Sequence, residues 1–171
     1  GVLPDRAGKT IYVLNTSANS ISVIDAASLK ELRQLSAGRA PWSLAISPDG
    51  RQIAATNIRS QFVKFREPSL SEVTLIDTER GVVERRVQVP GANLMQGVAW
   101  HPSGEFALFT LNRTKNLVPM TRLLQGWVIT NGLGVLWRDG REDQVLLDEP
   151  GLWERVLDLD RHRHLPAAPD A

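Results

Sequence analysis

Cationic side chains in two predicted loops are the residues of this sequence best suited to chemistry. The stretches 58–71 and 113–125 carry six Lys and Arg residues, with Glu67 as their single acid. Fixed positive charges attract anionic ligands and acidic protein surfaces. We therefore predict a binding site for an anionic partner, with solvated surface charge as the alternative, and the candidate residues are Arg39, Arg59, Lys64, Arg66, Arg113, Lys115, Arg122 and Trp127.

No set of residues indicates catalysis or a bound cofactor. The absence of cysteine excludes disulfides, thiolate zinc sites, Fe–S clusters and covalent haem within these residues. His162 and His164 alternate as metal ligands can, but they lie in a polar tail without carboxylates at fixed geometry. The Gly132-x-Gly134 pair lies inside a predicted strand rather than before a helix, which argues against a phosphate loop. We predict no catalytic residue, metal site or cofactor.

Composition narrows the classes of partner. The net charge of +1 argues against a nucleic-acid-binding protein, and 42% hydrophobic with 23% charged residues is typical of a globular chain. No apolar stretch approaches the roughly 20 residues that a membrane helix needs, so no membrane span is predicted. The N-terminus lacks the charged and apolar regions of a signal peptide.

Three repeated elements organise the chain around these residues. A Pro/Asp/Gly turn leads into an apolar strand at residues 4–15, 48–57 and 102–112, each ending in Asn. Residues 21–25 and 73–77 form a second matching strand that ends in Asp, and residues 42–47 and 96–101 form a third. The spacing of the Asn residues is 42 and then 55 residues, which suits four-stranded propeller blades of roughly 40–50 residues.

The repeat predicts roles for several conspicuous side chains. Trp42 and Trp100 fall in one repeated strand and are predicted to pack between blades. Asp25 and Asp77 are predicted to hydrogen-bond the turns that follow them, and His101 to be a turn residue before Pro102.

The predicted fold is all-β, a β-propeller segment of about three four-stranded antiparallel blades. The predicted blades are residues 1–37, 38–90 and 91–150, and an irregular tail follows at 151–171. Closed propellers have four to eight blades, which removes exposed sheet edges. We therefore expect an incomplete propeller that needs further blades or self-association.

Loop lengths indicate one face as the binding face. The connections between the second and third strands of each unit emerge on the same face, and they span residues 16–20, 58–71 and 113–125. Long insertions on one face of a repeat protein often mark its binding surface. A tolerated surface insertion is the alternative, because long loops add little entropic cost.

Two segments resemble the YVTN-type β-propeller repeats. Residues 11–15 (IYVLN) resemble the Y-V-T-N strand, and residues 42–50 (WSLAISPDG) resemble the P-x-x-h-A-h-S-P-D-G segment. Residues 116–134 are loosely similar to a segment of bacterial YVTN propellers joined to di-haem cytochrome c peroxidase-like domains. The resemblance implies a usually seven-bladed propeller of bacteria or archaea, often exported, whose relatives include surface-layer proteins, lactonase-like enzymes and electron-transfer partners. It therefore implies a periplasmic or cell-surface location.

Three functions follow from these observations. The first is a non-catalytic propeller scaffold that binds a protein partner or anionic ligand through its loop face. The second is a fragment of a lactonase-like or haem-oxidoreductase-linked enzyme whose catalytic groups lie outside this chain. The third is a structural repeat of a cell-surface protein.

Overall fold

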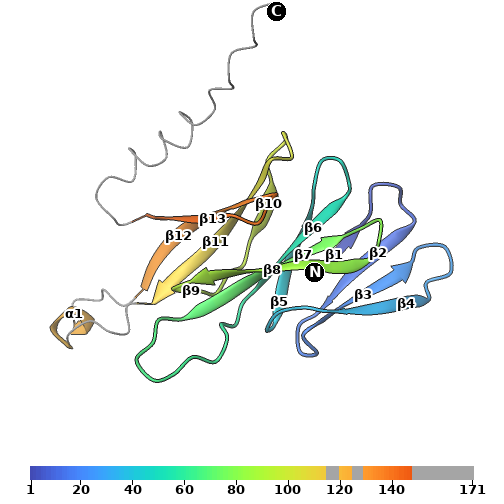
Figure 1. The fold of residues 1–171 in the computed structure, drawn as a ribbon. Coiled ribbons are helices and arrows are strands. Elements are labelled where there is room, and N and C mark those ends of the chain that lie inside the picture. Colours follow the sequence, from blue (N-terminus) through green and yellow to red (C-terminus); the bar gives the residue numbers. More distant parts are fainter. Residues whose placement is uncertain (115–119, 125–128, 148–171) are drawn as a thin grey trace, which may run out of the picture.

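Three antiparallel sheets make up the fold, which confirms the predicted all-β class of propeller-like blades (Figure 1). The computed structural model describes residues 1–114, 120–124 and 129–147. Blade 1 contains β1 (Val2–Pro4), β2 (Thr10–Asn15), β3 (Ser20–Asp25) and β4 (Glu31–Ser36). Blade 2 contains β5 (Pro41–Ile46), β6 (Gln52–Asn57), β7 (Leu70–Asp77) and β8 (Val82–Pro90). Blade 3 contains β9 (Ala92–Asn93), β10 (Val98–Trp100), β11 (Phe106–Thr114), β12 (Ile129–Trp137) and β13 (Glu142–Leu146), and α1 (Met120–Leu124) lies between β11 and β12.

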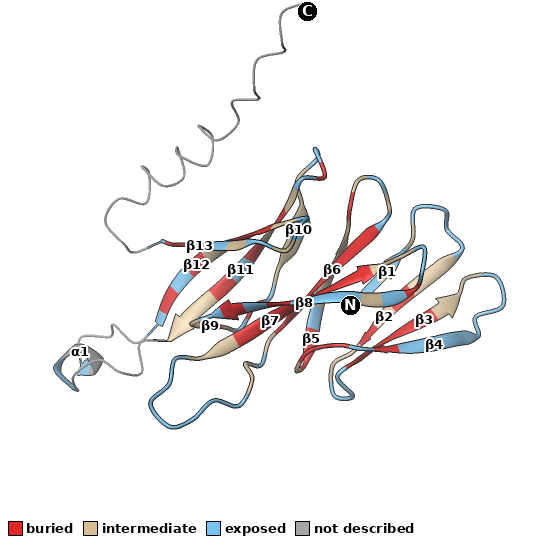
Figure 2. Ribbon diagram, in the orientation of Figure 1, coloured by how far each residue is buried: buried red, intermediate tan, exposed pale blue. Residues whose placement is uncertain are grey.

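The hydrophobic cores lie between neighbouring blades (Figure 2). Side chains alternate between the two faces of a strand, so Ile53 of β6 packs toward blade 1 and Ala54 toward blade 3. Tyr12 joins the first core and Phe109 the second, and both are almost fully buried. Blade 2 is therefore covered on both faces, which explains why every residue of β6 is buried.

An arginine contact between neighbouring blades occurs twice, each time at the turn between the third and fourth strands of the following blade. Arg33 of β4 donates to the carbonyl of Gly81 at 3.3 Å, and Arg85 of β8 donates to the carbonyl of Asp139 in the equivalent turn of blade 3. Gly81 has a left-handed φ of 62°, and a Cβ on it would lie 2.9 Å from the Nη1 atom of Arg33. Glycine at this turn therefore permits both the backbone conformation and the arginine contact.

The predicted turn roles are confirmed. The Oδ1 atom of Asp25 accepts the Ser28 N–H at 2.7 Å, and that of Asp77 accepts the Arg80 N–H at 2.8 Å, three residues on. His101 closes its turn by accepting the Gly104 N–H at its carbonyl. Local side-chain-to-backbone bonds of this kind are fixed by nearby sequence, which makes them predictable.

Asn112 does not occupy the position predicted from the repeat. The turns before β6 and β11 close through equivalent bonds, from Ser47 N–H to the Gln52 carbonyl and from His101 N–H to the Phe106 carbonyl, and these are 54 residues apart. Asn57 and Asn112 are 55 residues apart, one residue more than the structural repeat of 54. A shift of one residue moves a side chain to the opposite face of a strand. Asn57 is accordingly buried, whereas Asn112 is partly exposed and bonds Asn131.

The predicted packing of Trp42 between blades is wrong. The pairing of β5 with β6 shifts register between Pro41 and Ser43, and this irregularity leaves Trp42 49% exposed. A bulge re-aims the side chain of the unpaired residue. Trp100 fulfils the prediction, because it packs against the core of blades 2 and 3 and its indole N–H donates to the Ala45 carbonyl at 3.1 Å.

Asp49 should make the fold sensitive to acid. Its carboxylate accepts hydrogen bonds from the Ser47 hydroxyl at 2.6 Å, the Arg51 N–H and the Arg138 guanidinium, and these hold its pKa well below the ordinary value of 3.8. A carboxyl whose pKa is lower in the folded state adds stability that is present above the unfolded pKa and is lost as pH falls.

We expect the melting temperature of the wild-type protein to fall when the pH is lowered from 5 to 2.5. The melting temperature of Asp49→Asn should fall less over the same interval, because the asparagine side chain does not titrate. Thermal melts followed by circular dichroism at both pH values measure the difference. Equal acid sensitivity in the two proteins would contradict the assignment of this effect to Asp49.

Candidate binding face

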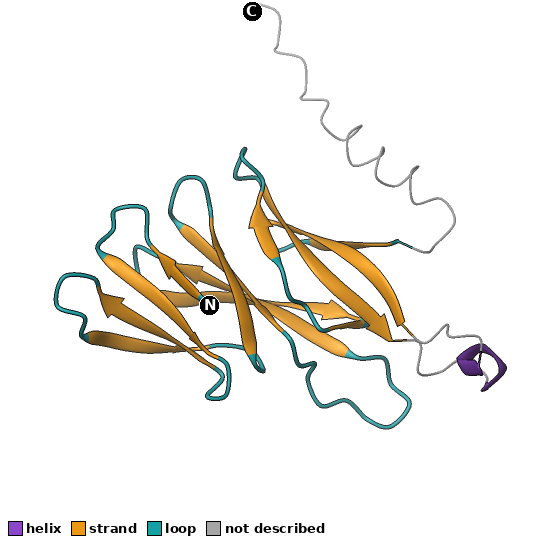
Figure 3. Cartoon of the chain, turned by 180° about the vertical axis from the view of Figure 1, so that it is seen from behind, coloured by secondary structure: helices purple, strands orange, loops and turns teal. Residues whose placement is uncertain are grey.

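The loop face is the end of the blades where the second strand of each blade connects to the third and where one blade passes to the next. Its described connections are residues 16–19, 37–40, 58–69, 91–97 and 120–124. Seen from behind, the longest fully described connection, 58–69, extends beyond the ends of the strands (Figure 3). Antiparallel topology thus brings segments from three blades to one end of the molecule.

The loop of residues 58–69 carries the densest positive charge on this face. Arg59, Lys64 and Arg66 are all exposed, and Glu67 is the only acid in the loop. At the base, the Gln61 N–H donates to the carbonyl of Leu70 at 2.7 Å, which ties the loop to the start of β7. The structure therefore places three of the predicted site residues together on one anchored loop.

Arg39 joins this cluster from the connection between blades 1 and 2. Its guanidinium donates to the Ser60 carbonyl at 2.5 Å and lies 3.9 Å from the centre of the Phe62 ring. A cation at this distance from an aromatic face is attracted to the ring. Arg39 thus supports the conformation of the loop and adds a fourth cation to it.

Arg113 lies apart from the predicted loop. It belongs to β11, which pairs with β12 as far as Thr114 opposite Ile129, so the strand extends beyond its predicted end. Its guanidinium donates to the Gln144 side chain at 2.9 Å, and its Nε atom lies against Gly91. The predicted residues Lys115 and Trp127, and the side chain of Arg122, lie outside the part of the chain that the structure describes.

Two phenylalanines on this face were missed by the sequence analysis. Phe62 and Phe65 are each 90% exposed, and the Arg66 guanidinium lies 5.5 Å from the centre of the Phe65 ring. The sequence signal for them is the presence of two Phe residues within a polar loop that lacks strand alternation.

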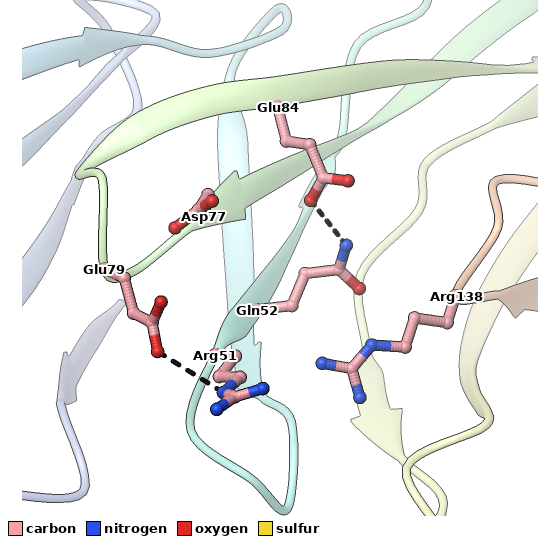
Figure 4. Close-up of a pocket in the computed structure, with 6 residues that line it drawn as sticks. All are labelled: Arg51, Gln52, Asp77, Glu79, Glu84 and Arg138. Atoms are coloured by element: carbon pink, nitrogen blue, oxygen red, sulfur yellow. Dashed lines mark hydrogen bonds and ion pairs between the residues drawn. The ribbon is translucent and has the colours of Figure 1, made fainter.

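A polar groove of about 230 Å³ lies at the opposite end of the blades (Figure 4). Its acids already have partners: Glu79 pairs with Arg51 at 3.3 Å, and Glu84 accepts the Gln52 amide at 2.7 Å. Asp77 accepts the turn N–H described above. Each carboxylate that lines the groove therefore already accepts a hydrogen bond or forms an ion pair, and their arrangement gives no indication of an acid–base pair.

The described residues contain neither a cluster of metal-ligating side chains nor a membrane-spanning helix. Over residues 1–114, 120–124 and 129–147, no group of three His, Cys, Asp or Glu side chains could hold a metal ion. No helix in those ranges is long and apolar enough to cross a membrane.

The stacked antiparallel sheets of four or five strands define a β-propeller protein. A model of the YNCE-like beta-propeller family matches residues 4–95, more than half of the chain, and the chain belongs to that family.

Known proteins share the same architecture. Hydrazine synthase subunit beta of Kuenenia stuttgartiensis is 30% identical over 121 residues, which are 69% of this chain and 29% of that protein. The solved structure of Kuenenia stuttgartiensis hydrazine synthase aligns with a TM-score of 0.74 at 25% identity, covering 87% of this chain and 42% of that one.

Two more distant structures share the fold alone. The Cps50 (Swd1) beta-propeller domain of Myceliophteria thermophila has a TM-score of 0.56 at 15% identity, over 90% of this chain and 40% of that one. The dihydro-heme d1 dehydrogenase NirN has a TM-score of 0.57 at 16% identity, over 87% of this chain and 28% of that one. The chain thus spans less than half the length of each of these relatives.

Proposed function

We propose that this chain is a non-catalytic binding module that recruits an anionic partner through its loop face. The observation that carries the proposal is the cluster of Arg39, Arg59, Lys64 and Arg66 against a single acid. Surface charges of one sign raise the rate of encounter with partners of the opposite sign and select among them. The relative that is 30% identical is a subunit of hydrazine synthase, which supports a role in binding another protein chain.

Three finer proposals rest on the sequence resemblance. Residues 11–15 and 42–50 resemble YVTN-type repeats, and residues 116–134 resemble propellers joined to di-haem peroxidase-like domains. The periplasmic or cell-surface location is implied by the same resemblance. A lactonase-like or haem-linked enzyme fragment and a structural repeat remain the alternative functions. Neither gains support from the groove, where Glu79 forms an ion pair and Glu84 accepts a hydrogen bond from an amide.

Removing the loop charges should weaken binding to an acidic polymer. Poly-L-glutamate serves as a surrogate for an acidic protein surface, and fluorescence anisotropy at 20 and 500 mM NaCl measures its affinity. We expect the triple variant Arg59→Ser, Lys64→Ser, Arg66→Ser to bind at least about tenfold more weakly at low salt, and the wild-type protein to lose affinity at high salt.

A matched control changes the same charge on the opposite end of the blades. Lys9, Lys30 and Arg80 are exposed there, and their replacement by Ser removes three cations as well. The proposal requires this control to bind like the wild-type protein. An equal loss of affinity in both variants would show that net charge matters and the loop face does not.

We propose further that the outer face of blade 1 packs against another blade, which a second copy supplies when the chain is alone. By turn register, three partly exposed residues of that face match three buried residues of blade 2 that pack on blade 1: Ile11, Val13 and Ile24 match Ile53, Ala55 and Ile76. The repeat thus presents an apolar surface where its neighbour has a core.

Sedimentation velocity tests this packing. The isolated chain should self-associate with rising concentration, and Ile24→Glu should shift it toward monomer because a charge would be buried in the contact. A chain that is monomeric at every concentration and unfolds cooperatively would contradict the proposal.

A further inference from the structure

The loop face combines its charge with unusually exposed apolar side chains. Phe62 and Phe65, each 90% exposed, are the most exposed large hydrophobic residues of the described chain, and Val63 between them is 39% exposed. On the same face, Met120 and Leu124 of α1 are 69% and 83% exposed. Exposed apolar side chains gathered on one face mark a surface that contacts something else.

Charge and apolar surface are interleaved at the level of single side chains. Lys64 separates the apolar pair Phe62–Val63 from Phe65 in the sequence, and the Arg39 guanidinium lies 3.9 Å from the Phe62 ring. The partner must therefore offer negative charge and apolar surface within a few ångströms of each other. The boundary between phosphate headgroups and acyl chains has that arrangement.

We propose that this face docks on an anionic lipid bilayer, with Phe62 and Phe65 entering the headgroup–acyl boundary and the surrounding cations contacting lipid phosphates. The inference rests on the proposed function and names its anionic partner. The Arg39 and Arg66 guanidinium groups lie beside the Phe62 and Phe65 rings, so these long side chains can reach the phosphates while the rings are buried.

The arrangement of the apolar residues favours a lipid surface over a protein pocket. They stand on the loop of residues 58–69 and on α1, which belong to neighbouring blades, and in both views this loop and α1 lie beyond the same end of the strands (Figures 1 and 3). The polar groove described above lies at the opposite end of the blades, away from this loop and α1. Projecting tips of this kind suit a broad deformable surface.

Co-sedimentation with vesicles tests the proposal directly. The full chain is mixed with vesicles of phosphatidylcholine alone or of phosphatidylcholine and phosphatidylglycerol at 70:30. We expect binding to the anionic vesicles, at least about tenfold weaker binding in 500 mM NaCl, and at least about tenfold weaker binding by Phe62→Ser, Phe65→Ser. The matched control is Leu29→Ser, Val82→Ser, which removes two exposed apolar residues from the opposite end of the blades and should bind normally.

A fluorescent label reports insertion separately from adsorption. The chain has no cysteine, so Val63→Cys offers a single site for an environment-sensitive nitrobenzoxadiazole label. Its emission should shift to the blue on anionic vesicles, while the label on Val82→Cys, a residue of nearly equal exposure at the opposite end, should not respond.

The outcomes separate this inference from the proposed function. Loss of vesicle binding in the Phe variant, with a blue shift at residue 63, supports docking on lipid. Unchanged vesicle binding by the Phe variant, or no vesicle binding by the wild-type protein while poly-L-glutamate still binds, overturns the lipid inference and leaves an acidic protein as the partner. Failure to bind either probe overturns both.

Discussion

Replacing Gly134 with alanine is expected to destabilise the fold more than any surface change, by about 3 kcal/mol. Gly134 of β12 lies directly opposite Phe109 of β11, and a Cβ on Gly134 would lie 2.1 Å from the Cζ atom of that ring. Phe109 is 1% exposed in the core between blades 2 and 3, so the ring has no open space to move into. The melting temperature should fall by roughly 6–12 °C, and urea unfolding gives the free energy.

A second variant shows whether the ring is the cause. In a Phe109→Leu background the smaller side chain leaves room for the methyl group, so the added cost of Gly134→Ala should drop below about 1 kcal/mol. Gly97→Ala is the matched control, because a Cβ there would meet Thr110 at an ordinary 3.4 Å. A cost of Gly134→Ala that is the same in the wild-type and Phe109→Leu backgrounds would argue against steric overlap.

The reason for glycine at position 134 could not be predicted from the sequence, whereas the turns could. The turns that define each blade were predictable because Asp25, Asp77 and the Pro-x-Gly segments bond residues only a few positions away. The space above Gly134 is filled by Phe109, and this contact exists only once β11 and β12 pair in register. The sequence could therefore place Gly134 in a strand without revealing why glycine is there.

The candidate site likewise contains features that were predictable from the sequence and features that depend on strand pairing. Repeat topology predicted that Arg39 and the cations of residues 58–69 share one face, because loop polarity follows from strand count alone. The sequence did not predict that Arg113 lies in a strand and not in the loop. Its hydrogen bond to Gln144 depends on how far the pairing of β11 with β12 extends. The burial of Asn57 against the partial exposure of Asn112 likewise depends on a single residue of register.

Arg86 of β8 should contribute strongly to stability, because it forms an ion pair within blade 2 and also hydrogen-bonds to blade 1. Its guanidinium contacts the Glu72 carboxylate at 3.1 Å, and it also donates to the Ser36 carbonyl at 3.0 Å and the Ser36 hydroxyl at 2.9 Å. The Glu72 side chain is only 10% exposed, and its other carboxylate oxygen accepts the Gln61 amide at 2.6 Å. Glu72 therefore links the contact between blades to the base of the basic loop.

We expect Arg86→Met to lower the free energy of unfolding by about 2–3 kcal/mol, because it leaves the nearly buried Glu72 carboxylate without its cation and removes the bonds to Ser36. This is less than the roughly 3–5 kcal/mol of a fully buried pair, since the Arg86 side chain is 38% exposed and partly screened. Urea unfolding of the single variants and of Arg86→Met, Glu72→Met forms a double-mutant cycle.

The double variant decides whether charge pairing or packing matters here. If the pair is the cause, replacing both charges should recover most of the stability lost in Arg86→Met, because no uncompensated carboxylate remains. A double variant no more stable than Arg86→Met would instead assign the contact to the bonds that Arg86 makes with Ser36, because both proteins lack those bonds. In that case blades 1 and 2 are joined by the backbone of β4, and the repeated arginine contact at Gly81 becomes the better model for how one blade holds the next.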